Sequence, residues 1–161
     1  MNTPFQRSYR FASPEDTTDF AARLAPALSG GDVLLLSGDL GAGKTHFARG
    51  IVQTKLALAG RVEDVPSPTF TLVQTYDAGD VEIWHSDLYR LTSVDEIYEL
   101  GLDEAFDTAI CLAEWPDRLG HETPIGALTL HFTMTEQPGE RMLLASSEDS
   151  RWSVILDCAR E

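Results

Sequence analysis

The stretch SGDLGAGKTHF, residues 37–47, follows the apolar run Val33–Leu36 and decides the fold class. It holds Gly38, four further residues and then the tripeptide Gly43–Thr45, which is the complete spacing of a Walker A phosphate-binding loop. Glycines let backbone N–H groups converge on phosphate oxygens, and the helix N-terminus that follows adds partial positive charge. A glycine-rich turn with a solvated lysine is the alternative, but an apolar strand before the loop and a helical pattern after it favour phosphate. The stretch therefore predicts a nucleoside triphosphate site.

The loop also assigns roles to individual side chains. The Lys44 ammonium is expected to reach the β- and γ-phosphates, and the Thr45 hydroxyl is expected to bind Mg²⁺. The nucleotide-binding residues expected within the loop are Gly38, Asp39, Leu40, Gly41, Ala42, Gly43, Lys44 and Thr45.

The absence of a guanine motif bears on the base. Guanine-specific P-loop proteins use an Asn/Thr-Lys-x-Asp motif. The only Thr-Lys pair here, Thr54-Lys55, has Ala57 where the aspartate is required. We therefore expect ATP rather than GTP.

The composition is that of one globular domain. The chain has 161 residues, 43% of them hydrophobic and 24% charged, so a single domain over residues 1–161 is expected. No stretch approaches the roughly 18 continuous apolar residues of a membrane span, and the N-terminus lacks a signal-peptide pattern. Cys111 and Cys158 lie in apolar runs without CxxC spacing, which is typical of reduced core thiols. A cytoplasmic location without membrane contact is expected.

The charge balance is strongly acidic. Lys and Arg number 12 against 26 Asp and Glu, which gives a formal net charge of −14. Binding to a nucleic-acid backbone depends on clustered Lys and Arg, and no basic stripe stands out. If nucleic acid takes part in the function, a partner is expected to hold it.

The pattern around the loop predicts an α/β fold: a single P-loop NTPase domain with a central mixed sheet flanked by helices and a strand-rich C-terminal half. Before the loop we expect an edge strand at 6–11 and a helix that starts after an N-cap at Ser13 and ends at 30–31. Directly after the loop, a helix is expected over 44–59.

The second half is expected to hold mainly strands. Strands are predicted after the proline-containing segment 64–68 and after a turn at 78–80, and an apolar strand precedes Glu114. Between them, a capping box of Ser93 and Glu96 predicts a helix that ends at Gly101. Apolar alternation predicts antiparallel strands around 127–135, 141–145 and 152–157.

Two carboxylates are candidates for the acidic group that a P-loop enzyme places near its metal, usually where an apolar strand ends beside the loop. Asp87 follows residues 81–84 with one short interruption, and Glu114 directly follows residues 110–113. Because Glu114 ends the more continuously apolar strand, it is the predicted metal-side acid. Asp87 is predicted to orient the attacking water or a metal-bound water. An exposed acid at a strand end is the alternative for each.

The segment PSPTF at 66–70 is a candidate switch. Two prolines restrict its backbone, so that the hydroxyls of Ser67 and Thr69 are expected on the γ-phosphate side. Ordinary turn chemistry is the alternative. Of the nearby side chains, His85 is expected to be structural, with a hydrogen bond near the site as the alternative. Arg90 is expected to pair with an acid rather than to act as an arginine finger. Tyr89 and Trp115 are expected to be packing groups.

Four segments occur together in the order seen in the TsaE family of small bacterial ATPases. They are GDLGAGKT at 38–45, SPTFTLV at 67–73, HSDLYRL at 85–91 and AICLAEWPDRLG at 109–120. The chain resembles this family from about Ser13 to Leu119. The resemblance implies a role in threonylcarbamoylation of the adenosine beside the anticodon in tRNAs that read codons beginning with A.

The family's properties set further expectations. Its members bind ATP and Mg²⁺, hydrolyse ATP slowly alone and act with the TsaD and TsaB proteins, of which TsaD carries out the carbamoyl transfer. Contact with tRNA is then expected only through the complex. The resemblance and the residue patterns together imply Lys44, Asp87 and Glu114 as catalytic residues, Thr45 and Glu114 at the metal, and Ser67, Thr69 and Trp115 at the nucleotide. His46 departs from the family, in which a second threonine is common.

A small-molecule P-loop kinase is the alternative function. Such an enzyme needs an acceptor pocket and an arginine-bearing lid, and the C-terminal half has few arginines. A nucleotide-gated binding module without turnover is a third possibility.

Overall fold

The apolar run before the phosphate loop becomes the central strand of a seven-stranded sheet in the computed structural model, which describes residues 4–69 and 71–159. The strands are β1 (Phe5–Phe11), β2 (Val33–Gly38), β3 (Val73–Asp77), β4 (Glu82–Asp87), β5 (Ile110–Glu114), β6 (Leu128–Met134) and β7 (Arg141–Ser147). Their order is β1-β7-β6-β2-β5-β4-β3. β2 lies parallel to β5 and β6, and β5 lies parallel to β4. The outer pairs are antiparallel, so the predicted mixed sheet is confirmed.

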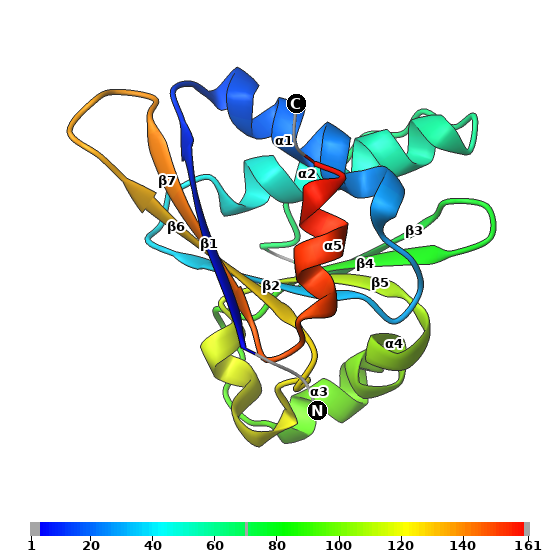
Figure 1. Ribbon diagram of the computed structural model, residues 1–161. Helices are drawn as coiled ribbons and strands as arrows, with labels where there is room; N and C mark the ends of the chain where they lie inside the picture. Colours follow the sequence, from blue (N-terminus) through cyan, green and yellow to red (C-terminus); the bar gives the residue numbers. More distant parts are fainter. Residues whose placement is uncertain (1–3, 70, 160–161) are drawn as a thin grey trace.

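Helices cover both faces of this sheet (Figure 1). α1 (Pro14–Leu24), α2 (Lys44–Leu58) and α5 (Arg151–Asp157) lie on one side, and α3 (Asp95–Leu100) and α4 (Leu102–Thr108) lie on the other. Each side has its own buried apolar cluster, and β2 contributes Leu34 and Leu36 to one and Val33 and Leu35 to the other. A parallel strand covered on both faces must be apolar at every position, which explains the continuous run at 33–36.

The N-terminal elements form close to their predicted positions. β1 is an edge strand, and the Ser13 hydroxyl caps α1 by accepting the N–H of Asp16 at 3.3 Å. The helix ends earlier than predicted, at Leu24, and continues only as a 3-10 turn over Ala25–Ala27. Pro26 explains the early end, because its ring nitrogen has no hydrogen to donate to the preceding helical turn.

The predicted strand at 152–157 is wrong, because this segment forms helix α5. Trp152 and Leu156 are buried one helical turn apart, whereas Val154 between them is 70% exposed. The Trp152 indole donates a hydrogen bond to the carbonyl of Gly126 at 2.9 Å. Three apolar residues in alternation therefore led to the wrong strand prediction. The two strands predicted before it, around 127–135 and 141–145, are confirmed as the antiparallel pair of β6 and β7.

The start of α3 also differs from prediction. The Glu96 carboxylate accepts the N–H and the hydroxyl of Thr92, at 3.0 and 2.6 Å, while the Ser93 hydroxyl accepts the N–H of Asp95. Hydrogen bonds from Thr92 and, to a smaller extent, the N–H of Ser93 lower the pKa of Glu96, so the predicted capping box forms only in part. Gly101 ends the helix as predicted, with the left-handed φ of 80° that glycine adopts readily.

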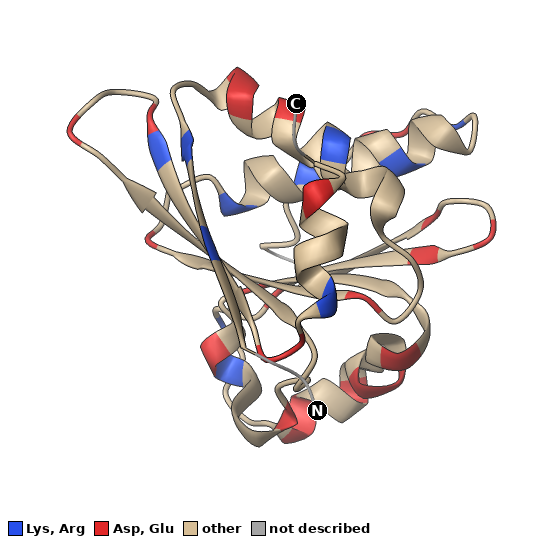
Figure 2. Cartoon of the chain, viewed as in Figure 1, with Lys and Arg blue, Asp and Glu red and all other residues tan. Residues whose placement is uncertain are grey.

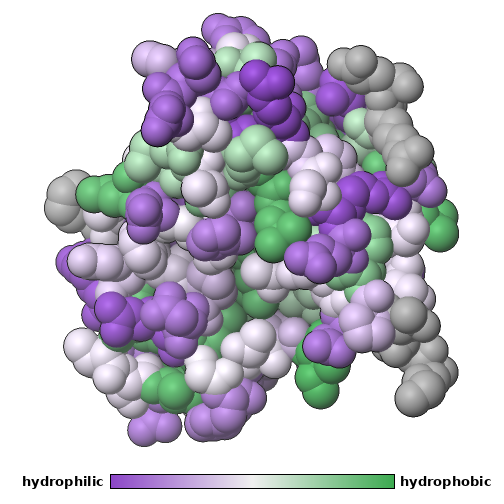
Figure 3. Space-filling model, turned by 60° about the vertical axis from the view of Figure 1, so that its left-hand side comes forward, coloured by the Kyte–Doolittle hydropathy of each residue, from purple (hydrophilic) through white to green (hydrophobic). Residues whose placement is uncertain are grey.

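The surface is acidic and mostly hydrophilic. Figure 2 shows acidic positions on both helical layers and in the loops, with Lys and Arg scattered between them. On the face in Figure 3, hydrophobic side chains form small separate areas. Both cysteines are free, but only Cys111 is a core thiol, since Cys158 is exposed. No helix in the described part of the chain is long and apolar enough to cross a membrane.

Candidate phosphate-binding site

The parallel strands bring the phosphate loop and both candidate acids to one edge of the sheet. β5 lies between β2 and β4, so that Glu114 pairs with Leu36 on one side and with Asp87 on the other. The loop leaves β2 at the same edge. Ligands of parallel α/β sheets bind outside the carboxyl ends of the strands, which makes this edge the candidate site.

The loop backbone depends on its glycines. Gly38, Gly41 and Gly43 have φ angles of 134°, 82° and 110°, in a region that favours glycine. A Cβ on Gly38 would also lie only 2.4 Å from the carbonyl oxygen of Phe132 on β6. α2 begins immediately afterwards at Lys44, so its N-terminal N–H groups face the site.

Lys44 is 4% exposed and is held by the loop and an aromatic ring. Its Nζ donates to loop carbonyls, 3.1 Å from that of Asp39, and lies 4.1 Å from the ring centroid of Trp115. Burial lowers the pKa of Lys44, while the charges of Glu114, Asp87 and Asp39 act in the opposite direction. The structure thus places Lys44 and Trp115 together beside both candidate acids.

Glu114 is the most connected acid of the site. It is 2% exposed, and the Thr45 hydroxyl donates to its two oxygens at 2.8 and 2.9 Å. His85 Nε2 lies 2.6 Å from Glu114 Oε2, and His85 is completely buried. The sequence analysis favoured a structural role for His85 over a hydrogen bond near the site. Its spacing of two residues from Asp87 was a usable signal, because alternate residues of a strand share a face.

These donors fit Mg²⁺. Thr45 and Glu114 supply a hydroxyl and a carboxylate within hydrogen-bond distance of each other. Within the described residues, no group of three or more His, Cys, Asp or Glu side chains is arranged to hold a metal. Mg²⁺ commonly takes one or two carboxylates and completes its shell with substrate phosphates and water. The protein side of the site therefore suits a metal that arrives with a phosphate ligand.

Asp87 meets the predicted switch segment. Its Oδ1 accepts the N–H of Tyr89 at 3.0 Å, and the Thr69 hydroxyl lies 3.4 Å from its Oδ2. The hydroxyls of Ser67 and Thr69 are 2.6 Å apart. The structure thus brings the Thr69 hydroxyl to the second acid and the Ser67 hydroxyl to Thr69. Phe70, the last residue of the predicted segment, lies outside the described residues.

A second, apolar cavity adjoins the loop. The ring of Tyr89 contacts that of Trp115 edge-on, with the ring centroids 4.8 Å apart. Tyr89 is nevertheless 55% exposed, which is more than expected for a side chain predicted to serve packing. Arg90 donates to the carbonyl of Thr69 at 2.6 Å. The loop cavity measures about 260 Å³ and the adjoining one about 370 Å³, the latter lined by Leu40, Thr69, Asp87, Tyr89, Arg90 and Trp115.

Arg141, the first residue of β7, also reaches the phosphate loop. Its Nε donates to the carbonyl of Ala42 at 3.0 Å, and its Nη2 donates to the carbonyl of Gly41 at 3.2 Å. The sequence interpretation did not select this residue. Roughly a hundred positions separate the partners, and no local spacing signals the contact.

His46 ties the start of α2 to the start of α1. Its Nε2 lies 2.9 Å from the Thr18 hydroxyl and 3.1 Å from the carbonyl of Pro14. A Cβ on Gly139 would lie 3.6 Å from Pro14, so the turn between β6 and β7 adjoins the same corner. The residue that departs from the family pattern therefore joins two helices beside the loop.

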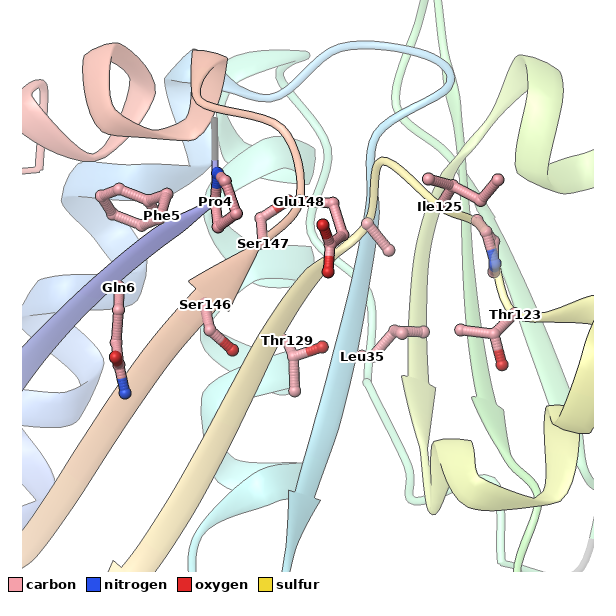
Figure 4. Close-up of a pocket in the computed structure, with 12 residues that line it drawn as sticks. Pro4, Phe5, Gln6, Leu35, Thr123, Ile125, Thr129, Ser146, Ser147 and Glu148 are labelled. Carbon is pink, nitrogen blue, oxygen red and sulfur yellow. The ribbon is translucent and has the colours of Figure 1, made fainter. Parts of the chain in front are cut away.

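A larger hollow of about 620 Å³ lies elsewhere on the sheet (Figure 4). Residues of β1, β2, β6 and β7 form its floor, and Thr123 and Ile125 border it. Of its lining residues only Glu148 is charged, and none belongs to the phosphate loop. The larger volume therefore does not mark the phosphate site, which is identified by its donors and acids.

Comparison with known proteins identifies the family. A family profile described as threonylcarbamoyl adenosine biosynthesis protein TsaE matches residues 11–143. The tRNA threonylcarbamoyladenosine biosynthesis protein TsaE of Rickettsia conorii is 47% identical over 109 residues, which are 68% of this chain and 61% of that protein. Its counterpart in Bacillus subtilis is 40% identical over 120 residues, 74% of this chain and 72% of that protein.

A solved structure extends the similarity to nearly the whole fold. The crystal structure of YdiB from Bacillus subtilis superposes with a TM-score of 0.79 at 29% identity, covering 99% of this chain and 97% of that one. The resemblance in the sequence motifs, the P-loop fold and these matches agree. The chain belongs to the TsaE family, which is named for the biosynthesis of threonylcarbamoyladenosine in tRNA.

Proposed function

We propose that this chain is the Mg²⁺-dependent ATPase subunit for threonylcarbamoylation of the adenosine next to the anticodon in tRNAs reading codons that begin with A, acting with TsaD and TsaB. The observation that carries the ATPase assignment is the contact of the Thr45 hydroxyl with the Glu114 carboxylate beside the buried Lys44. The pathway rests on family membership.

Each group of the site has a place in phosphoryl transfer. Lys44 and the loop N–H groups bind the β- and γ-phosphates, and Thr45 and Glu114 hold Mg²⁺. Mg²⁺ held by these two side chains would supply positive charge against the phosphate oxygens. Asp87 accepts a hydrogen bond from the attacking water and orients it. Thr69, which already meets Asp87, passes the state of the γ-phosphate to the segment around Ser67.

Turnover is proposed to depend on the partners. The residues that line the loop cavity include one lysine and no arginine. An arginine finger is worth about 10³–10⁵ in rate in P-loop enzymes, so the isolated chain is a slow ATPase. The net charge of −14 opposes tRNA phosphates, and TsaD and TsaB therefore hold the tRNA.

Two measurements test this proposal. The rate of ATP hydrolysis is measured as purified TsaD and TsaB are added, and the tRNA affinity of the isolated chain is measured at about 0.1 M salt, where charges are screened over about 10 Å. We expect a low rate that rises with both partners and weak tRNA binding. Tight, salt-sensitive tRNA binding by the isolated chain would contradict the division of labour. A high rate that ignores the partners would favour an independent enzyme, including the kinase alternative.

A further inference from the structure

Arg141 is joined to the outer side of the phosphate loop by two hydrogen bonds. The acceptors are the carbonyls of Ala42 and Gly41, and a third bond runs from Nη1 to the carbonyl of Glu140 at 2.9 Å. The guanidinium thus spans from the start of β7 to the middle of the loop. Gly41 and Gly43 line the loop cavity, and the guanidinium approaches the loop from the side of the Gly41 and Ala42 carbonyls.

Peptide geometry links this contact to the N–H groups of the loop. In a trans peptide, the C=O and N–H point in opposite directions. The Ala42 carbonyl shares its peptide with the N–H of Gly43, and the Gly41 carbonyl shares its peptide with the N–H of Ala42. The Ala42 N–H is already bonded to the carbonyl of Asp39 at 3.0 Å. Holding the Ala42 carbonyl on Arg141 therefore turns the Gly43 N–H to the opposite side of the loop.

Ala42 is buried and the N–H of Phe47 donates to the Gly43 carbonyl at 2.9 Å, so Arg141 adds to contacts on either side of the Ala42–Gly43 peptide. Gly41 and Gly43 have no side chains to pack, and glycine loses more conformational freedom on ordering than any other residue. A cation on the carbonyl side also polarises the peptide and strengthens its N–H as a donor. A binding site that is ordered in advance saves the cost of ordering it when the ligand arrives.

Glu140, the acid next to Arg141 in the sequence, bonds through its carboxylate to other side chains. The Glu140 carboxylate accepts hydrogen bonds from the Thr135 hydroxyl and Arg10 Nε, both at 2.7 Å. The hydrogen bond from Thr135, followed by the one from Arg10, lowers the pKa of Glu140. Arg10 thus pairs with the Glu140 carboxylate in the β6–β7 hairpin, while Arg141 donates to the carbonyls of the phosphate loop.

We propose that Arg141 is a positioning residue that orients the Gly43 N–H of the phosphate loop toward the β-phosphate of the bound nucleotide. This inference rests on the proposed nucleotide-binding function. It assigns a role in ligand binding to Arg141 of β7, a residue outside the four motif segments.

The test uses Arg141→Gln and Arg141→Lys, with Arg10→Gln as the matched control. Arg10 binds the same hairpin without contacting the loop. Affinities for ATP, ADP and AMP are measured with Mg²⁺ by calorimetric titration. We expect Arg141→Gln to weaken ATP and ADP about tenfold, near the effect of one hydrogen bond to a charged group, and to leave AMP unchanged. Arg141→Lys is expected to lose less, because it keeps the charge without the two-pronged geometry.

A ligand-free readout separates this inference from the proposed function. Hydrogen exchange and the chemical shift of the Gly43 amide are measured by NMR in each variant without nucleotide. We expect both to change in Arg141→Gln and not in Arg10→Gln. Unchanged Gly43 signals and unchanged ADP affinity in a folded Arg141→Gln protein would overturn the inference, as would an equal loss for all three nucleotides. If the wild type binds no nucleotide, the proposed function fails and the amide measurement still decides the positioning role.

Discussion

Replacing Glu114 by alanine tests the centre of the site. The change removes the acceptor shared by Thr45 and His85. Thr45 is half-buried and its hydroxyl can turn to water, but His85 is completely buried and loses its carboxylate partner. An unsatisfied buried polar group costs about 1–3 kcal/mol. For a protein of this size that corresponds to a melting temperature lower by about 2–12 °C.

The functional effect of Glu114→Ala is expected to be larger than the loss of stability. If Glu114 holds Mg²⁺ with Thr45, its loss removes the only carboxylate bonded to that hydroxyl among the described residues. We expect the tightening of ATP binding by Mg²⁺ to fall by at least about tenfold. ATP affinity in EDTA should stay close to that of the wild type. Calorimetric titrations with Mg²⁺ and with EDTA, beside a thermal melt of each protein, measure these quantities.

The matched control for this experiment is Asp87→Ala. Asp87 pairs with Glu114 across β4 and β5 but bonds to Tyr89 and Thr69 instead of Thr45. We expect Asp87→Ala to reduce turnover while leaving ATP affinity largely intact. Full Mg²⁺ dependence in Glu114→Ala, with its loss in Asp87→Ala, would refute the reasoning and exchange the two roles.

The other predictions concern the loop, the base and the thiols. Lys44→Ala and Thr45→Ala should each abolish hydrolysis with an unchanged circular dichroism spectrum, and wild-type turnover in Lys44→Ala would show that the loop is not catalytic. Mg-ATP should bind more tightly than Mg-GTP in a titration, and equal or tighter GTP binding would contradict the base assignment. Burial raises the pKa of Cys111 to about 12. A thiol reagent at pH 8 should therefore modify Cys158 in the native protein and Cys111 only after unfolding, and rapid reaction of both would argue against the buried position.

Local sequence patterns predicted the parts of the fold that short-range physics controls. The run Val33–Leu36 had to be a covered strand, and the loop after it had to return through glycines at positive φ. Ser13 began a helix because its hydroxyl can accept an N–H three residues later. The acids Asp87 and Glu114 were selected because each follows an apolar strand.

The local sequence pattern did not determine the secondary structure where a short segment fitted both the two-residue period of a strand and the 3.6-residue period of a helix. Residues 152–157 alternate in hydrophobicity and also place two large side chains one turn apart. The segment forms a helix because this conformation buries Trp152 and Leu156 in the apolar cluster that also contains side chains of α1 and α2. In the same way, the Glu96 carboxylate accepts its hydrogen bonds mainly from Thr92, one residue before the predicted N-cap Ser93.

The sequence by itself determined that a phosphate loop follows a buried strand and that two carboxylates end neighbouring apolar segments, because those features depend on residues only a few bonds apart. The sequence favoured Glu114 over Asp87 as the metal-side acid, but only the tertiary structure brings Glu114 to Thr45, since that contact follows from the order of β2, β5 and β4 in the sheet. It also brought His85 to Glu114 and Arg141 to the loop. These contacts join residues 29 and 99 positions apart in the sequence. A hydrogen bond of about 3 Å between such distant residues produces no spacing pattern that the sequence alone could reveal.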